Sequence, residues 1–322
     1  MTFAAQIMAD IGTDIDLAIS LLQASDLVGI PTETVYGLAG NALDEEAILK
    51  IYKAKNRPKF DPLIAHASSM ETIRDLAMNI PDEAEKLAEQ LWPGPLTLLL
   101  EKSERIPDLL TSGLPRVAFR IPNHPITLKL LERLDFPLAA PSANPFGYVS
   151  PVEASHVNEQ LGDRIKYILD GGSCTVGLES TIVGFKGGKA IVHRLGGTSI
   201  EQLRKIVGDV EVDINNSSNP VAPGMLKSHY SPGRKLILGD IEKNAAKFED
   251  QQIGVISFEK DYGVGKKQFV LSPSGDLEEA AGNLFKALRF MDNPEIELIL
   301  SEQVPSHGLG LAINDRLRRA AV

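Results

Sequence analysis

Four cations lie within seven residues, at Lys53, Lys55, Arg57 and Lys59, in a chain whose formal net charge is -10. Lysine and arginine are favoured at the carboxyl end of a helix by the helix dipole, so the spacing alone favours a solvated helix end. The alternative is that these groups bind phosphate, for which ammonium and guanidinium groups are common protein partners. The choice depends on which residues lie near the cations in the fold.

Segments rich in hydroxyl groups could supply such neighbours. They are residues 31–37, 141–144 and 180–181, at predicted turns or strand ends. Guanidinium groups hold polyphosphates and carboxylates through bidentate contacts, and hydroxyl groups add finer placement. None of the three segments has the pattern of a P-loop or of the G-x-G-x-x-G fingerprint. A nucleotide site in this chain would therefore be of another kind.

Alternation of side chains puts two arginines on one face of a strand predicted at residues 116–121. Val117 and Phe119 point to one side, whereas Arg116 and Arg120 point to the other. The surrounding pattern predicts further strands and helix starts that would position these groups. The strands lie at residues 27–30, 96–100, 165–169, 180–185 and 190–195, and the helices start at Thr13, Asp44, Ser68, Pro81 and Thr198.

The last third of the chain has a different organisation. Predicted strands at residues 235–238, 254–258 and 297–300 alternate with helices at 277–290 and 310–320, which is typical of a small parallel-sheet domain. Between the two parts, periodicity is lost and Asn, Ser and Pro accumulate. We therefore predict a larger domain at 1–208, a linker at 209–234 and a smaller domain at 235–322.

Composition excludes several classes of protein. Cys174 is the only cysteine, so the chain has neither a disulfide framework nor a cysteine-rich zinc module, and this thiol is best interpreted as a small buried apolar group. The six histidines show no H-E-x-x-H spacing, so we predict no metal site. The acidic balance opposes general binding of nucleic acid. No signal peptide and no apolar run of about 20 residues is present, so we expect a cytoplasmic protein without a membrane span.

Six motifs occur in the order typical of the YrdC-like threonylcarbamoyl-AMP synthases, which this chain resembles. They are PTETVYGL at 31–38, KNRP with PLIAH at 55–66, PGPLT at 93–97, RIP at 120–122, PSAN at 141–144 and GLEST at 177–181. In addition, HYSP at 229–232 is similar to the linker of the longer members. The resemblance implies an α/β fold, with an open twisted mixed sheet in the catalytic domain and a smaller Rossmann-like parallel α/β domain.

The resemblance also implies the reaction and its participants. Such an enzyme makes threonylcarbamoyl-AMP and pyrophosphate from L-threonine, bicarbonate and ATP, for the threonylcarbamoyladenosine modification of tRNA next to the anticodon. The product would pass to a tRNA threonylcarbamoyl-transferase, with weak or no direct binding of tRNA. Mg²⁺ would enter with ATP, because the sequence has no dedicated acidic metal motif.

Site residues follow from the resemblance position by position. L-threonine is expected at Thr34, His66, Arg120, Ala140 and Ser180. ATP is expected at Lys55, Arg57, Asp61, Ser142, Asn144, Ser150, Arg194 and Tyr230, with Lys55 and Arg57 as the catalytic cations. By pattern alone, His66 would be only a strand-end histidine.

Two positions depart from the family's pattern. Asp61 stands where asparagine is expected, and its carboxylate would repel a triphosphate unless a cation lies between them. Arg116 stands where a small polar residue is common. Both departures concern the contacts with phosphate.

Two other functions compete with this interpretation. In the first, the chain is a non-enzymatic RNA-binding module, and the cations at residues 53–59 contact phosphates. In the second, it is a maturation factor of the carbamoyltransferase type, although such proteins carry cysteine-rich zinc modules that a single cysteine cannot build.

The linker carries a prediction of its own. Pro220, Pro223 and Pro232 stiffen a segment that also contains Gly224, Lys227, His229 and Tyr230. We predict that the segment closes over the catalytic cavity as a lid, with Tyr230 on the nucleotide. The alternative is a solvated spacer.

Overall fold

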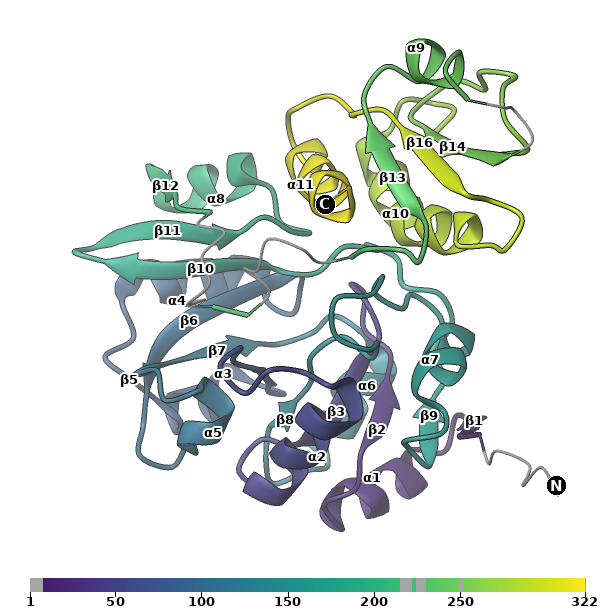
Figure 1. Ribbon diagram of the computed structural model, residues 1–322. Coiled ribbons are helices and arrows are strands. Elements are labelled where there is room, and N and C mark those ends of the chain that lie inside the picture. The colour runs from purple at the N-terminus through teal and green to yellow at the C-terminus, as the bar shows by residue number, and fades with distance from the viewer. Residues whose placement is uncertain (1–7, 215–221, 224–229, 249–251, 322) are drawn as a thin grey trace, which may run out of the picture.

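The computed structural model describes residues 8–214, 222–223, 230–248 and 252–321. A large part built on a mixed sheet and a smaller part built on a parallel sheet lie against each other (Figure 1). The predicted fold class, two α/β units of which the first has a mixed sheet, is confirmed. Within the described residues, no helix is long and apolar enough to cross a membrane.

The large sheet mixes parallel and antiparallel neighbours. In spatial order its strands are β1 (Asp10–Gly12), β9 (Tyr167–Leu169), β2 (Val28–Ile30), β3 (Gly37–Asn41), β8 (Leu138–Ala139), β4 (Ile64–His66), β7 (Arg116–Arg120), β6 (Leu96–Lys102), β10 (Thr181–Lys186), β11 (Lys189–Arg194) and β12 (Val210–Val212), and β5 (Ala77–Met78) pairs with β6. Strands β4 and β7 run parallel, so that His66 lies opposite Arg120. Two predicted site residues are thereby brought to one edge of the sheet.

Helices surround this sheet, and their starts show how local sequence sets the fold. They are α1 (Ile15–Gln23), α2 (Glu45–Lys55), α3 (Met70–Arg74), α4 (Asp82–Leu91), α5 (Asp108–Thr111), α6 (Pro125–Glu132), α7 (Ala154–Leu161) and α8 (Ile200–Val207). Asp44 caps α2 as predicted, and its carboxylate accepts from the backbone N–H of Glu46. At the other end of α2, the capping residue Asn56 has a left-handed backbone conformation, and Arg57 follows it.

Three predicted helix starts are wrong by one residue. The cap of α1 is Asp14 rather than Thr13, that of α3 is Ser69 rather than Ser68, and that of α8 is Ser199 rather than Thr198. In each helix the neighbouring residue has the extended backbone that lets its side chain reach the first free N–H groups. Thr198 instead donates its hydroxyl to the carbonyl of Pro95.

Part of the predicted linker belongs to the large sheet. Strand β12 lies within 209–234 and pairs in parallel with β11. The lid prediction concerns residues beyond it, and Pro220, Gly224, Lys227 and His229 lie outside the described residues. Pro223 and Tyr230 are described.

The smaller domain has a fully parallel sheet in the order β13 (Lys235–Leu238), β16 (Leu298–Ser301), β14 (Ile253–Ser257) and β15 (Lys267–Val270). Its helices are α9 (Ile241–Ala245), α10 (Leu277–Met291) and α11 (Gly310–Ala320). The helices predicted at 277–290 and 310–320 match α10 and α11 closely. Strand β15 and helix α9 were not expected, because each is short and carries a weak apolar pattern.

Helices α10 and α11 face the large domain, and α11 lies between the small sheet and the β10–β11 end (Figure 1). Backbone packs closely at this interface. A Cβ atom added to Gly177 would lie 2.6 Å from the Cα of Gly282 in α10, and Gly177 has a φ of +68°. Only glycine meets both demands, so the GLEST motif starts on a backbone contact between domains.

Candidate active site

A pocket opens on the large domain beside the ends of β4 and β7, and its empty space, counted together with the open solvent at its mouth, is about 580 Å³. The predicted site residues that line it are Thr34, Arg57, His66, Arg120, Ala140, Ser142, Ser180, Arg194 and Tyr230. The pocket therefore gathers residues that are far apart in the sequence.

Arg120 is fixed in place at the end of β7. Its Nη1 donates to the hydroxyl of Thr34 at 2.8 Å, and its Nε donates to the carbonyl of Gly94 at 3.2 Å. Its Nη2 lies 2.7 Å from the carboxylate of Glu33. A guanidinium held from three sides in this way is oriented before a ligand binds, which favours recognition of a carboxylate.

Ser180 and Arg194 form a second polar group on the pocket wall. Nη2 of Arg194 donates to the Ser180 hydroxyl at 3.0 Å and to the Ser180 carbonyl at 2.8 Å. The Ser180 hydroxyl also pairs with that of Thr97 at 2.7 Å. Burial lowers the pKa of Arg194 to about 10, so its guanidinium remains charged at neutral pH.

His66 faces the pocket as a neutral imidazole. Burial, together with the charge of Arg120, lowers the pKa of His66 to about 3. Such a group orients a ligand by hydrogen bonding but holds no charge near pH 7.

Arg57 pairs with Asp61, whose carboxylate would otherwise repel a phosphate. Its Nη2 lies 2.8 Å from the Asp61 carboxylate, and its Nε donates to the Asp61 carbonyl at 3.1 Å. Asp61 is fully buried and does not line the pocket, whereas Arg57 does. The carboxylate is thus paired with a cation of the protein that itself lines the pocket.

Lys55 lies behind the pocket wall. Its Nζ donates to the carbonyls of Ser142 and Asn144, each at 2.5 Å. Burial, aided by the charge of Arg57, lowers the pKa of Lys55 well below its ordinary value. Lys55 therefore holds the PSAN loop in this structure, and its contact with phosphate stays a prediction.

Asn144 and Ser150 also lie behind the wall. Asn144 donates to the carbonyls of Pro145 and Tyr148, both at 2.8 Å. The Ser150 hydroxyl donates to Glu179 at 2.6 Å. Four predicted site residues thus support the pocket lining from behind and are not part of it: Lys55, Asp61, Asn144 and Ser150. Arg116 lies at the other end of β7, at another surface depression.

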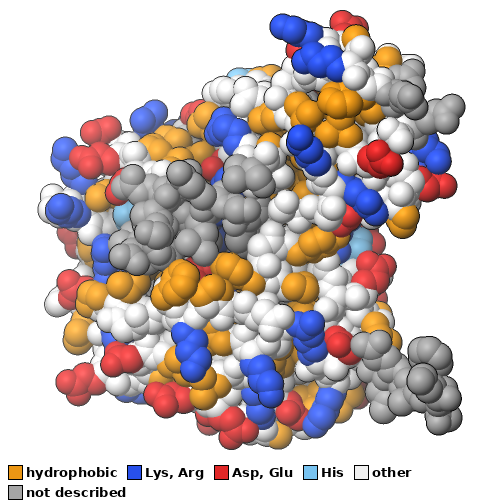
Figure 2. Space-filling model, viewed as in Figure 1, with side chains coloured by type: hydrophobic (Ala, Val, Ile, Leu, Met, Phe, Trp, Pro, Cys, Tyr) orange, Lys and Arg blue, Asp and Glu red, His pale blue; other side chains and the backbone are white. Residues whose placement is uncertain are grey.

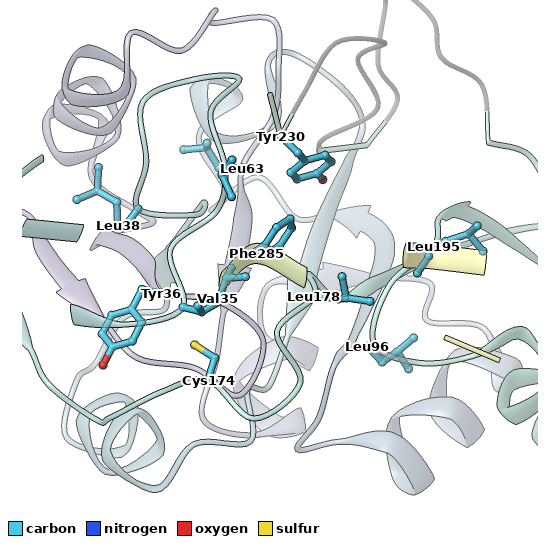
Figure 3. Packing of buried hydrophobic residues seen from close by; sticks show 14 of the residues in the cluster. Val35, Tyr36, Leu38, Leu63, Leu96, Cys174, Leu178, Leu195, Tyr230 and Phe285 are labelled. Carbon is cyan, nitrogen blue, oxygen red and sulfur yellow. The ribbon is translucent and has the colours of Figure 1, made fainter. Parts of the chain in front are cut away.

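Tyr230 lines the pocket and is held by the smaller domain. Its ring stacks on Phe285 of α10 with 5.5 Å between centroids, as Figure 3 shows from close by. The guanidinium carbons of Arg316 and Arg319 in α11 lie 4.9 and 4.8 Å from the Tyr230 ring centroid. Tyr230 is almost fully buried, with a φ of +66°.

Sequence reasoning missed two residues near the pocket. Glu179 lines the wall and is buried, and it stood inside the GLEST motif as a signal that was available. Arg316 contacts Glu179 from α11. No local pattern distinguishes Arg316 from the neighbouring charged residues of that helix, so the sequence alone offered no signal for it.

Other reactive groups play no evident part at this site. Burial raises the pKa of Cys174 to about 12, so its thiol is protonated, and it packs near Val35 (Figure 3). Among the residues that the structure describes, no three histidine, cysteine, aspartate or glutamate side chains gather so as to hold a metal ion.

Comparisons with known proteins place the chain. A family model described as telomere recombination, covering Sua5, YciO and YrdC proteins, matches residues 20–196, and the model of the threonylcarbamoyl-AMP synthase C-terminal domain matches residues 198–322. Threonylcarbamoyl-AMP synthase of Pyrococcus abyssi is 42% identical over 95% of this chain and 94% of its own. The protein of that name in Bacillus subtilis is 38% identical over 94% and 92%.

A solved structure of a relative has the same fold. The crystal structure of P. abyssi Sua5 complexed with L-threonine matches with a TM-score of 0.91 and 41% identity, over 98% of this chain and 97% of that one. The similarity thus extends over both domains. The chain belongs to the threonylcarbamoyl-AMP synthase family, in its two-domain form, and is a nucleotidyltransferase.

Proposed function

We propose that the pocket binds L-threonine, bicarbonate and ATP and joins them into threonylcarbamoyl-AMP. The amine of threonine and bicarbonate give N-carboxy-threonine and water. An oxygen of the new carboxylate attacks the α-phosphorus of ATP, a P–O bond forms, and pyrophosphate leaves. The observation that carries the proposal is the convergence of Arg57, Arg120 and Arg194 on one pocket together with the hydroxyls of Thr34 and Ser180.

Threonine would bind at the Arg120 end of the pocket. Its carboxylate matches the guanidinium of Arg120, while Thr34, Ser180 and the neutral imidazole of His66 match its hydroxyl and amine. Ala140 adds apolar surface for its methyl group. The L-threonine in the P. abyssi structure supports this ligand.

ATP would bind toward Arg57, Ser142, Arg194 and Tyr230. Attack on a phosphate builds negative charge that fixed cations stabilise, so positioning and electrostatics carry most of the catalysis. Arg57 and Arg194 would supply that charge, and Tyr230 would cover the nucleotide.

Mg²⁺ would accompany ATP as part of the substrate. Mg²⁺ reaches protein sites through one or two carboxylates, waters and substrate phosphates. The buried carboxylates nearest the pocket, Glu33, Asp61 and Glu179, each pair with an arginine. We therefore expect the phosphates of ATP and water, rather than a protein cage, to hold the ion.

Binding of RNA has less support. Lys55 and Arg57 are buried, so the cluster at residues 53–59 presents only Lys53 and Lys59 to solvent. Figure 2 shows basic side chains on one face of the molecule separated by acidic and apolar ones rather than joined in a band. We therefore infer that the product passes to a tRNA threonylcarbamoyl-transferase in the cytoplasm, which contacts the tRNA.

Pyrophosphate release tests the proposal. The full chain is incubated with L-threonine, bicarbonate, ATP and Mg²⁺, and each substrate is omitted in turn. Release that requires all three substrates is expected. Equal release without bicarbonate would indicate ordinary aminoacyl adenylation and contradict the proposed nucleophile. L-serine in place of L-threonine should react less well, by roughly 1 to 3 kcal/mol for one missing methyl group.

A further inference from the structure

Arg316 of α11 closes a ring of contacts around the pocket wall. Its Nε lies 2.9 Å from the Glu179 carboxylate, and its Nη2 donates to the Leu195 carbonyl at 2.8 Å. Glu179 directly precedes Ser180, and Leu195 directly follows Arg194. Because Arg194 donates to Ser180, the two segments are tied together on the pocket side as well as by Arg316 behind.

The ring is closely packed, so its geometry leaves little freedom. The backbone N–H of Gly197 donates to the Glu179 carbonyl at 2.9 Å. A Cβ atom added to Gly196 would lie 2.2 Å from that same carbonyl oxygen. The remaining oxygen of the Glu179 carboxylate accepts from Ser150. Glu179, which Arg316 contacts, is therefore tied to the wall through both its carbonyl and its carboxylate.

Charge keeps the ring together. The Arg316 side chain is fully buried, and its Nη1 donates to Asp315 at 2.6 Å. Burial alone would raise the pKa of Glu179, but Arg316 and Arg194 outweigh it and hold the pKa below its ordinary value. Truncating one partner of such a pair leaves the other charge buried and uncompensated, which is strongly unfavourable.

We propose that Arg316 is a positioning residue through which the smaller domain sets the places of Ser180, Arg194 and Tyr230 in the pocket. It holds the first two through Glu179 and Leu195, and it holds the third by lying over its ring. The inference rests on the proposed function, since those three residues are the ones expected to contact threonine and ATP. It assigns the C-terminal domain a direct part in forming the site.

The test compares variants of the full chain. Arg316→Met removes the charge and keeps the length, Arg316→Lys keeps the charge but loses the planar fork, and Arg318→Met changes an exposed arginine of the same helix. We expect Arg316→Met to lower kcat/KM by about ten- to a hundredfold, because displacements of about 1 Å at a site have effects of this size. KM for both threonine and ATP should rise. Arg318→Met should behave like the wild type.

A pH profile separates positioning by charge from a general loss of packing. Without Arg316, Glu179 keeps Arg194 beside it, with Tyr230 and Arg319 nearby, but loses its closest cation. Its pKa then rises. A larger share of Glu179 is protonated as pH falls, so the acid limb of the kcat/KM profile should move to higher pH. Arg316→Lys should keep the limb near its wild-type place.

Glu179→Gln supplies the matched rescue. In the double variant Glu179→Gln with Arg316→Met, position 179 no longer carries a buried carboxylate that has lost its arginine. The shift of the acid limb should therefore disappear. The midpoint of thermal unfolding, which Arg316→Met should lower, should return toward the wild-type value. A loss in Arg316→Met that is the same at every pH and is not relieved by Glu179→Gln would overturn the inference. So would kcat/KM within twofold of the wild type. If Arg316→Met does not fold, the acid limb and kcat/KM are measured on the double variant and on Arg316→Lys, and the same outcomes support or overturn the inference.

Two further readouts keep this test apart from that of the proposed function. Failure of the wild-type chain to release pyrophosphate would contradict the proposed function. ATP affinity measured by calorimetry does not depend on turnover, and it should weaken about tenfold or more in Arg316→Met. Unchanged ATP affinity in a folded Arg316→Met protein would contradict the inference while leaving the function intact.

Discussion

The guanidinium of Arg120 lies 2.7 Å from the carboxylate of Glu33, and both side chains are almost fully buried. Glu33 belongs to the turn that also provides Thr34, which accepts from the same guanidinium. The turn after β2 therefore holds the arginine of β7 in one orientation. The Glu33 carboxylate acts on the pocket through Arg120 rather than by lining it.

Glu33→Gln should weaken threonine binding. The amide keeps the shape but removes the charge that orients Arg120, so KM for threonine should rise about tenfold, equivalent to about 1.4 kcal/mol. KM for ATP should change much less, because Arg57 and Arg194 keep their own partners. Steady-state kinetics with each substrate varied checks this, with exposed Glu132→Gln as the control. Equal rises in both KM values would contradict a role confined to Arg120.

Arg57→Ala should impair both stability and ATP use. Removing the guanidinium leaves Asp61 buried without its cation, which costs about 3 to 5 kcal/mol when a buried pair is broken. Asp61→Asn in the same chain should restore most of the unfolding free energy but not the ATP affinity. Urea unfolding and calorimetry measure the two effects separately. Lys59→Ala, an exposed change in the same cluster, should leave both unchanged, and recovery of ATP affinity in the double variant would refute phosphate binding by Arg57.

His66 should make stability depend on pH. An unfolded histidine titrates near 6.5, whereas the pKa of folded His66 is about 3. Between these values the unfolded chain binds a proton that the folded chain does not, so stability is complete above about pH 6.5 and is lost as pH falls toward 3. His156, with a pKa of about 4, acts in the same direction.

His66→Asn should therefore reduce the loss of unfolding free energy between pH 7 and pH 5. Urea unfolding at the two pH values measures it, with exposed His307→Asn as the control. The same loss in the wild type and in His66→Asn would mean that His66 is not buried as a neutral group.

Gly177→Ala should loosen the contact between domains. The added Cβ would meet the backbone of α10 at 2.6 Å, and neither side can move without shifting a main chain. Gly113→Ala is the matched control, because Gly113 also has a positive φ but nothing within 4 Å. Both variants bear the cost of left-handed backbone, whereas only Gly177→Ala should expose sites to limited proteolysis between the domains and lower activity. Equal effects of the two changes would assign the loss to backbone conformation alone.

Part of the large sheet could be predicted, because strands β2, β6, β7, β9, β10 and β11 carry strong local signals. The alternation at residues 116–121 gave β7, and the paired glycines at 187–188 separate β10 from β11. Helix starts were less certain, since adjacent Ser, Thr and Asp residues compete as caps and backbone conformation decides among them. Strands β1, β3, β5, β8 and β12 were missed, because segments of two to five residues carry too little pattern, and helices α5, α6 and α7 were missed as well.

The pocket was predicted unevenly for a physical reason. Thr34, Arg120 and Ser180 were predicted because each lies inside a motif whose other residues are also typical of the family. Whether a cation faces a ligand or a carbonyl depends on the fold, and so the inward turn of Lys55 onto the PSAN loop could not be foreseen. Arg316 acts on residues far from it in sequence, and only tertiary structure brings them together.

The contact between Arg316 and Glu179 also bears on the order in which this protein is made. Synthesis proceeds from the amino terminus, and domains fold as they emerge. The segments that carry Glu179 and Arg194 precede α11 in the chain, so Glu179 of the nascent large domain has Arg194 nearby before Arg316 is made. The contacts of Arg316 with Glu179 and Leu195 therefore form only after the second domain has been translated and has docked.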